Sequence, residues 1–225
     1  MLVKKTASCE QMLTWFEQNN QLVDFPLPGD LVFFKYPTNN RRANHIGLVT
    51  NVNTANDFTT DEGNTSLTSN DNGGAVMSRK RTLKNVVAFG RPKYTNKDQI
   101  NRIIAIASAE VGITEYPPGS NNVKYNTWFY GRQVSGKNYP WCCTFISYIF
   151  DILGGGTKPS KSTLKMGSVG PEVRELQQLL NKRGYNLTVD GEFGKLTKAS
   201  VMNFQRANGL TDDGIVGPKT WNKLL

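Results

Sequence analysis

The chain has 225 residues, 38% of them hydrophobic and 10% aromatic, which supports buried cores and excludes a disordered chain. Its length predicts one sizeable domain and a smaller second one. The formal net charge of +9 favours polyanionic partners, namely nucleic acid, an anionic membrane or an anionic cell wall. The longest basic run, Arg79-Lys80-Arg81, is short and strand-like, so we do not expect nucleic acid as a partner.

In chain order, the apolar periodicity first predicts a short helix over residues 8–18. Alternating or apolar runs then predict strands over 30–34, 45–52, 75–77 and 86–89, with a hairpin-type turn at 72–74. A second helix is expected from about Ile100 to Val111, with Gly112 as its stop, and a third over 141–153. Strands followed by helices predict an α+β domain over residues 1–156.

A Gly-, Pro-, Ser- and Lys-rich stretch predicts a flexible linker over residues 157–163. The remaining residues, 164–225, contain an internal echo, because the Asp-Gly turn at 190–191 and its sequel reappear at 213–214. Amphipathic segments between glycines at helix-end positions predict a small three-helix domain.

The chain has a single histidine, His45, which is therefore the only imidazole available for catalysis. Cys142 opens the third predicted helix, where unpaired N–H groups and the helix dipole should lower the pKa of its thiol. A thiol nucleophile with an imidazole is sufficient for amide hydrolysis. Cys143 lies about 100° further around the helix and is interpreted as core, while Cys9, near the first helix start, is the rival nucleophile. A buried structural cysteine is the plain alternative for each.

A third group should orient the imidazole. Strand alternation would place Glu62 and Asn64 on one face, although Glu-Gly-Asn is also a good turn. One histidine and no Cys-x-x-Cys pair are too few for a zinc site, and no phosphate-binding glycine loop or calcium loop is found, so we expect neither metal nor cofactor. The cysteine count predicts free thiols, and the N-terminus has no secretory h-region or membrane-spanning stretch.

The first domain resembles the CHAP family, cysteine- and histidine-dependent amidohydrolases and peptidases of the NlpC/P60 superfamily. The second half of a CHAP domain is similar to residues 28–34, 44–47, 62–66, 72–76 and 90–92 of this chain. The first half of that domain is similar to residues 110–112, Glu115, 119–121 and 141–142. The halves stand in reversed order, which implies a circularly permuted, papain-like antiparallel sheet with helices. By position, Cys142 resembles the nucleophile, His45 the base, and Glu62 and Asn64 the residues that orient and assist it. The reversed order also leaves open completion between two chains, so we expect a monomer or a domain-swapped dimer.

The tail resembles a three-helix peptidoglycan-binding domain, on Gly170, 176–177, 190–194, Thr197, 204–205, 208–210 and 213–217. Together the two resemblances imply an endolysin-like peptidoglycan hydrolase, either an N-acetylmuramoyl-L-alanine amidase or an endopeptidase. It would be made in the cytoplasm without a signal peptide, reach the wall by holin-type release, and not insert into membranes. The alternatives are an inactive wall-binding protein and a thiol-dependent acyl transferase on wall peptides.

Overall fold

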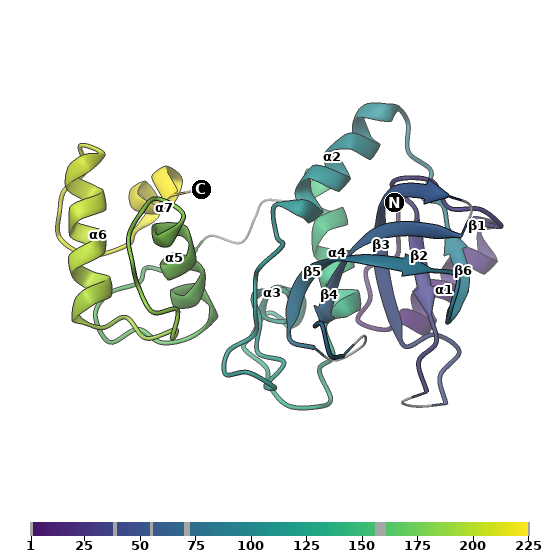
Figure 1. Ribbon diagram of the computed structural model, residues 1–225, viewed down its shortest axis with the longest axis horizontal. Coiled ribbons are helices and arrows are strands. Elements are labelled where there is room, and N and C mark those ends of the chain that lie inside the picture. The colour runs from purple at the N-terminus through teal and green to yellow at the C-terminus, as the bar shows by residue number, and fades with distance from the viewer. Residues whose placement is uncertain (1, 38–39, 55, 70–72, 156–160, 225) are drawn as a thin grey trace. The chain divides into compact units, whose positions relative to one another are not determined.

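The computed structural model describes residues 2–37, 40–54, 56–69, 73–155 and 161–224, which fall into two compact units divided between Thr157 and Lys158 (Figure 1). The first unit contains the strands β1 (Leu22–Val23), β2 (Leu31–Phe34), β3 (His45–Thr54), β4 (Asp57–Thr65), β5 (Ala75–Thr82) and β6 (Val86–Gly90). Its helices are α1 (Cys9–Gln18), α2 (Lys97–Ser108), α3 (Lys124–Tyr130) and α4 (Cys142–Leu153). The second unit contains α5 (Pro171–Asn181), α6 (Lys195–Ala207) and α7 (Pro218–Leu224).

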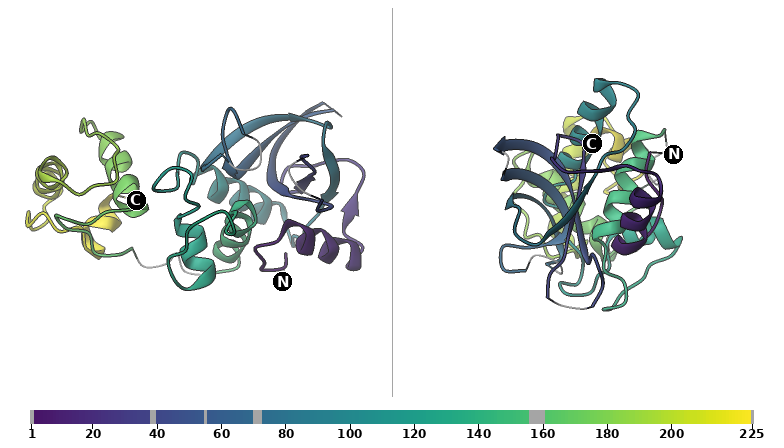
Figure 2. Two further views of the ribbon diagram at one scale, coloured as in Figure 1. Left: turned by 90° about the horizontal axis from the view of Figure 1, so that it is seen from below. Right: turned by 90° about the vertical axis from the view of Figure 1, so that its right-hand side faces the viewer.

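The first unit is an α+β fold built on one antiparallel sheet of six strands, in the order β1-β6-β2-β3-β4-β5. Alternation along the strands gives each face its own apolar cluster. The helices pack on one face, as Figure 2 shows, where α1 and α4 share a core with Leu31, Phe33, Ile46 and Leu48. The opposite face carries a smaller cluster that includes Val32, Phe34, Tyr36, Val49, Phe58 and Phe89.

Helix α4 is the centre of the helical layer, because it contacts α2, α3, β3 and β4. All but two of its twelve residues are buried. The close approach of β4 depends on Gly63, since a Cβ there would lie 2.7 Å from Phe145 Cβ and 3.0 Å from Trp141 Cζ3. Only a glycine therefore allows β4 to lie this near the start of α4.

Most predicted elements of the first unit form, together with the short unpredicted edge strand β1 and with three further differences. β4 is a full strand of polar sequence, α3 lies in the stretch expected to be a loop, and α2 ends at Ser108 rather than at Gly112. The last difference has a clear cause: Gly112 N–H donates to Val76 O, and Val76 N–H donates to Ile113 O, at 2.9 and 2.8 Å. These residues leave the helix to pair with the edge strand β5. Residue 72 of the predicted hairpin turn lies outside the described residues.

The second unit is a three-helix fold whose internal repeat extends to individual hydrogen bonds. On α5, Gln177 Nε2 donates to Asp190 Oδ1, Glu192 O and Thr197 Oγ1, and Gln177 Oε1 accepts from Gly191 N. On α6, Gln205 makes the same four bonds to Asp213, Ile215, Thr220 and Gly214. Each glutamine fixes one Asp-Gly turn, so the repeated sequence encodes a repeated local structure.

The last residues of the predicted linker 157–163 contact the second unit. Residues 157–160 lie outside the described residues, but Lys161 forms an ion pair with Glu175, and Trp221 Nε1 donates to Ser162 O at 2.9 Å. The second unit therefore includes these residues, because they cover its tryptophan. Among the described residues, every helix is too short or too polar to cross a membrane.

Replacing Gly63 with alanine should destabilise the first unit by about 1–3 kcal/mol, because the added methyl overlaps Phe145 and the start of α4 must move. Urea unfolding measures the change. Gly154→Ala, at the other end of α4, is the matched control, because its Cβ would meet neighbours at an ordinary 3.5 Å. Equal stabilities of the two variants would contradict the close-packing argument.

Candidate active site

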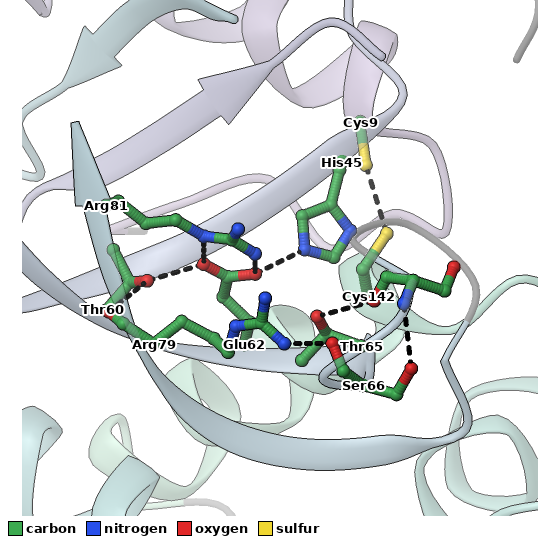
Figure 3. A network of polar contacts seen from close by, with 10 residues as sticks. Cys9, His45, Thr60, Glu62, Thr65, Ser66, Arg79, Arg81 and Cys142 are labelled. Carbon is green, nitrogen blue, oxygen red and sulfur yellow. Dashed lines mark hydrogen bonds and ion pairs between the residues drawn. The ribbon is translucent and has the colours of Figure 1, made fainter. Parts of the chain in front are cut away.

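The single histidine is fully buried at the first position of β3 and is held by a carboxylate from the neighbouring strand β4. His45 Nε2 and Glu62 Oε2 are 2.8 Å apart, and both side chains have an exposed fraction of 0% (Figure 3). The imidazole also lies beside the rings of Phe34 and Tyr36, with centroids 6.0 and 5.9 Å away. The ring is therefore fixed in both position and orientation.

The buried Glu62 carboxylate is surrounded by donors. Arg81, on β5, reaches it with two nitrogens, Nε at 2.6 Å from Oε1 and a terminal nitrogen on Oε2, and the Thr60 hydroxyl donates to Oε1. Burial alone would raise the pKa of Glu62, but Arg81 and His45 outweigh it and lower that pKa to about 2. The carboxylate is thus ionised throughout the neutral range.

Cys142 is the first residue of α4, and its thiol lies on the other side of the imidazole from Glu62 (Figure 3). The two distant halves of the sequence therefore meet within one chain. Burial lowers the pKa of His45, but its interactions with Cys142 and Glu62 outweigh this and raise that pKa to about 9. The other ring nitrogen, His45 Nδ1, lies on the Cys142 side. It is buried and has no hydrogen-bond partner among the described residues.

The Cys142 thiol differs from the expectation for a helix start. Its pKa is raised well above the ordinary value by the contact with Cys9 and by burial, while His45 lowers it by less. The two sulfur atoms are 3.4 Å apart. The expected lowering of the pKa is therefore wrong for this arrangement, because a second thiol lies beside that of Cys142. Cys143 is fully buried, in agreement with its interpretation as core.

Asn64 is fully buried two residues after Glu62, but simple strand alternation does not describe it. Its φ of 60° is left-handed, and the pairing of β4 with β5 shifts between Glu62 and Thr65. Its carbonyl accepts from Gly73 N at 2.9 Å. The argument from alternation thus fails at this residue, although Asn64 lies in the strand that carries Glu62.

Two residues of the Glu62 cluster were missed by the sequence reasoning, Arg81 and Thr60. In the sequence, Arg81 is part of the short basic run 79–81. The alternation of Arg79 and Arg81 in a predicted strand was the available signal, but the register of β5 against β4 decides that Arg81 reaches Glu62. The described residues contain no group of three or more His, Cys, Asp or Glu side chains able to hold a metal ion.

The second unit is similar to known proteins. Residues 169–224 match the family described as "Putative peptidoglycan binding domain". The C-terminal unit is a peptidoglycan-binding domain. The zinc D-Ala-D-Ala carboxypeptidase of Streptomyces albus G is 49% identical over 67 residues, which are 28% of this chain and 26% of that protein. A spore cortex-lytic enzyme of Oceanobacillus iheyensis is 40% identical over 67 residues, 29% of this chain and 24% of that protein.

A third relative, the N-acetylmuramoyl-L-alanine amidase CwlM of Mycobacterium tuberculosis, is 45% identical over 56 residues, 24% of this chain and 14% of that protein. All three relatives are named as cell-wall hydrolases, and the similarity lies over the binding domain. The similarity thus covers only 14–26% of the length of these three relatives.

The raised pKa of His45 makes the stability of the first unit depend on pH. A folded-state pKa of about 9 against 6.5 unfolded means that the stabilisation is complete below pH 6.5 and is lost as the pH rises through 9. The shift corresponds to a loss on the order of 3 kcal/mol. Urea unfolding followed by tryptophan fluorescence at pH 6 to 9 should show this loss in the wild type but not in His45→Gln. Parallel pH profiles would exclude a charged, Glu62-paired His45.

Removing Arg81 should expose the cost of the buried carboxylate. Arg81→Gln leaves Glu62 with one cationic neighbour, so we expect a loss of about 3–5 kcal/mol in stability and a rise in the Glu62 pKa. Arg81→Lys, which keeps the charge but not the two-nitrogen contact, should lose less. Lys80→Gln is the control, since Lys80 is exposed on the same strand. Urea unfolding at pH 7 ranks the variants, and an Arg81→Gln chain as stable as Lys80→Gln would contradict this assignment.

Proposed function

We propose that this chain is a peptidoglycan hydrolase in which Cys142 and His45 cleave an amide bond in the peptide part of the wall. One observation carries the proposal: a thiol at a helix start lies against an imidazole held by a buried carboxylate, in a chain that ends in a peptidoglycan-binding domain. The bond cleaved is either the muramoyl–alanine amide, which an amidase cleaves, or a peptide bond, which an endopeptidase cleaves. The proposal covers both, because both reactions use the same catalytic groups.

The first unit is proposed to be a circularly permuted CHAP domain of the NlpC/P60 type. In that reading the segment before α1 follows the cysteine helix in the ordinary order. Thr6 N donates to Ser147 Oγ at 3.1 Å, and Ser147 Oγ donates to Thr6 O at 2.8 Å, so the segment lies along α4. The ordinary ends would be joined near residues 93–100, after β6 and at the start of α2, which are exposed or half-buried. Permutation is tolerated where ends lie close together.

Charge balance supports a thiolate as the reactive form. With Glu62 ionised and Arg81 and His45 protonated, the buried cluster carries two positive charges and one negative charge. A Cys142 thiolate adds the second negative charge and makes the cluster neutral, which offsets part of the cost of burying these ions. The attraction of His45 already lowers the thiol pKa, against the effects of Cys9 and burial.

The reaction follows from this arrangement. The Cys142 thiolate attacks the amide carbonyl, and the His45 imidazolium donates its proton to the leaving amine. Neutral His45 then takes a proton from water, whose oxygen attacks the acyl-enzyme, and the thiolate leaves. Glu62 keeps the His45 ring oriented in both steps. This is the role of the third residue in a catalytic triad.

The start of α4 can supply the oxyanion donors. The N-cap residue Trp141 makes no side-chain cap hydrogen bond, and its indole N–H donates to Glu115 at 3.2 Å. An indole has no acceptor to offer the first-turn N–H groups. Those groups can therefore donate to the negative charge that develops on a carbonyl bound at Cys142.

The binding domain would raise the local concentration of wall peptides at the first unit, an avidity effect without chemistry of its own. The net charge of +9 favours anionic wall polymers as additional partners.

Alanine replacement of the three cysteines tests the assignment of the nucleophile. Cys142→Ala should abolish lysis of purified walls under reducing conditions, whereas Cys9→Ala and Cys143→Ala should retain it, because only Cys142 faces His45. Lysis is followed as the loss of turbidity, and the amino acid that bears the new amino terminus distinguishes an amidase product, which begins with the first alanine, from an endopeptidase product, while no new reducing ends should form.

Co-sedimentation with insoluble peptidoglycan is the control, and Cys142→Ala should sediment as the wild type does. Lysis that survives Cys142→Ala would overturn the Cys142 mechanism. Binding without lysis by the wild type would support a wall-binding protein instead, and a product carrying an added amine would support an acyl transferase.

A further inference from the structure

Two cysteines that are far apart in the sequence lie side by side in the core of the first unit. Cys9 and Cys142 are the first residues of α1 and α4, and their sulfur atoms are 3.4 Å apart (Figure 3). Both are free thiols, with exposed fractions of 6% and 3%. The mechanism proposed above uses Cys142 and gives Cys9 no part.

The contact is fixed by the fold rather than by chance rotation of two side chains. The reciprocal Thr6–Ser147 hydrogen bonds hold the segment before α1 against α4. Ser8 caps α1 by accepting from Gln11 N, so the helix must begin at Cys9. A disulfide needs the sulfurs to approach by a little over 1 Å from here, to about 2.05 Å.

We propose that Cys142 and Cys9 form an oxidative modification site, in which a hydroperoxide converts the two thiols to a disulfide that blocks Cys142. The bond itself is independent of the proposed function, whereas its effect on lysis rests on that function. Neither residue is completely enclosed, since Cys9 and Cys142 keep exposed fractions of 6% and 3%, and hydrogen peroxide is a small molecule.

The chemistry balances in two steps. The Cys142 thiolate attacks one peroxide oxygen, the O–O bond breaks, and the departing hydroxide takes up the proton that the thiol released on ionising, which gives water and a sulfenic acid. The Cys9 sulfur then attacks the sulfenic sulfur, the S–O bond breaks, and a second water leaves as the disulfide forms. Two thiols are oxidised, and one hydroperoxide is reduced.

Cys143 is the competing partner. It follows Cys142 on α4, is fully buried, and interacts electrostatically with Cys9. The backbone places it about 100° around the helix from Cys142. The geometry therefore favours Cys142, whose sulfur meets that of Cys9 directly.

The test uses the full chain, reduced, desalted and treated with equimolar hydrogen peroxide. After alkylation of the remaining thiols, mass spectrometry of tryptic peptides should find the Cys9 peptide joined to the peptide that contains Cys142. Since that peptide also contains Cys143, the same experiment on Cys143→Ala identifies the sulfur involved. A joined peptide in Cys143→Ala supports the site, and its absence there overturns it.

Activity gives a second, separate readout. Oxidised wild type should lose lysis at least tenfold and recover most of it in dithiothreitol. Cys9→Ser should lyse walls in dithiothreitol, but an excess of peroxide should inactivate it irreversibly, because a second peroxide oxidises the sulfenic Cys142 to the sulfinic acid when no Cys9 thiol condenses with it. Full recovery of Cys9→Ser, or undiminished lysis by the cross-linked wild type, would overturn the protective and blocking roles. If the reduced chain does not lyse walls, the proposed function fails, and peptide mapping still decides the disulfide.

Discussion

The first unit is organised around an ionised carboxylate without access to water. Glu62 has an exposed fraction of 0%, and an isolated charge in that position would cost several kcal/mol. Arg81 meets it with two nitrogens from β5, Thr60 donates from β4, and His45 meets it from β3. Three neighbouring strands must therefore keep their register for this charge to remain compensated. The orientation of the imidazole is a consequence of that requirement.

The same cluster sets opposing demands on Cys142. His45 and the net positive charge of the Arg81–Glu62–His45 group favour a thiolate, whereas burial and the neighbouring Cys9 favour the thiol. The largest effect comes from Cys9, which is a contact between two helix starts. The arrangement of α1 against α4 therefore controls how readily Cys142 ionises, independently of the His45–Glu62 pair. This coupling has its source in the Thr6–Ser147 hydrogen bonds, which hold the segment before α1 against α4.

The sequence contained the elements and the reacting groups but not the pairings between them. The helix over 141–153, the single histidine and the Asp-Gly echo were readable, because each depends on local residues or on counting. Arg81 was not, because its contact with Glu62 depends on the β4–β5 register, which shifts within the strand. Apolar periodicity also does not predict strand β4, because its buried residues are mostly polar. They are stabilised by hydrogen bonds from other elements, as where Ser108 donates to Asp61 at 2.7 Å. Likewise α2 ends early because residues 112–113 pair with β5, a long-range contact that overrides a local stop signal.

The second unit reaches its fold by a different route, which explains why it could be read from sequence alone. Each Asp-Gly turn is fixed by one glutamine from the preceding helix, Gln177 or Gln205, over a separation of 8 to 20 residues. Its core is a cluster of its own that includes Phe193, Phe204 and Trp221. Short-range bonds repeated twice need little information beyond the local pattern. A site built from Cys9, His45, Glu62, Arg81 and Cys142 needs contacts across more than a hundred residues, so wall binding is encoded locally and the proposed chemistry globally.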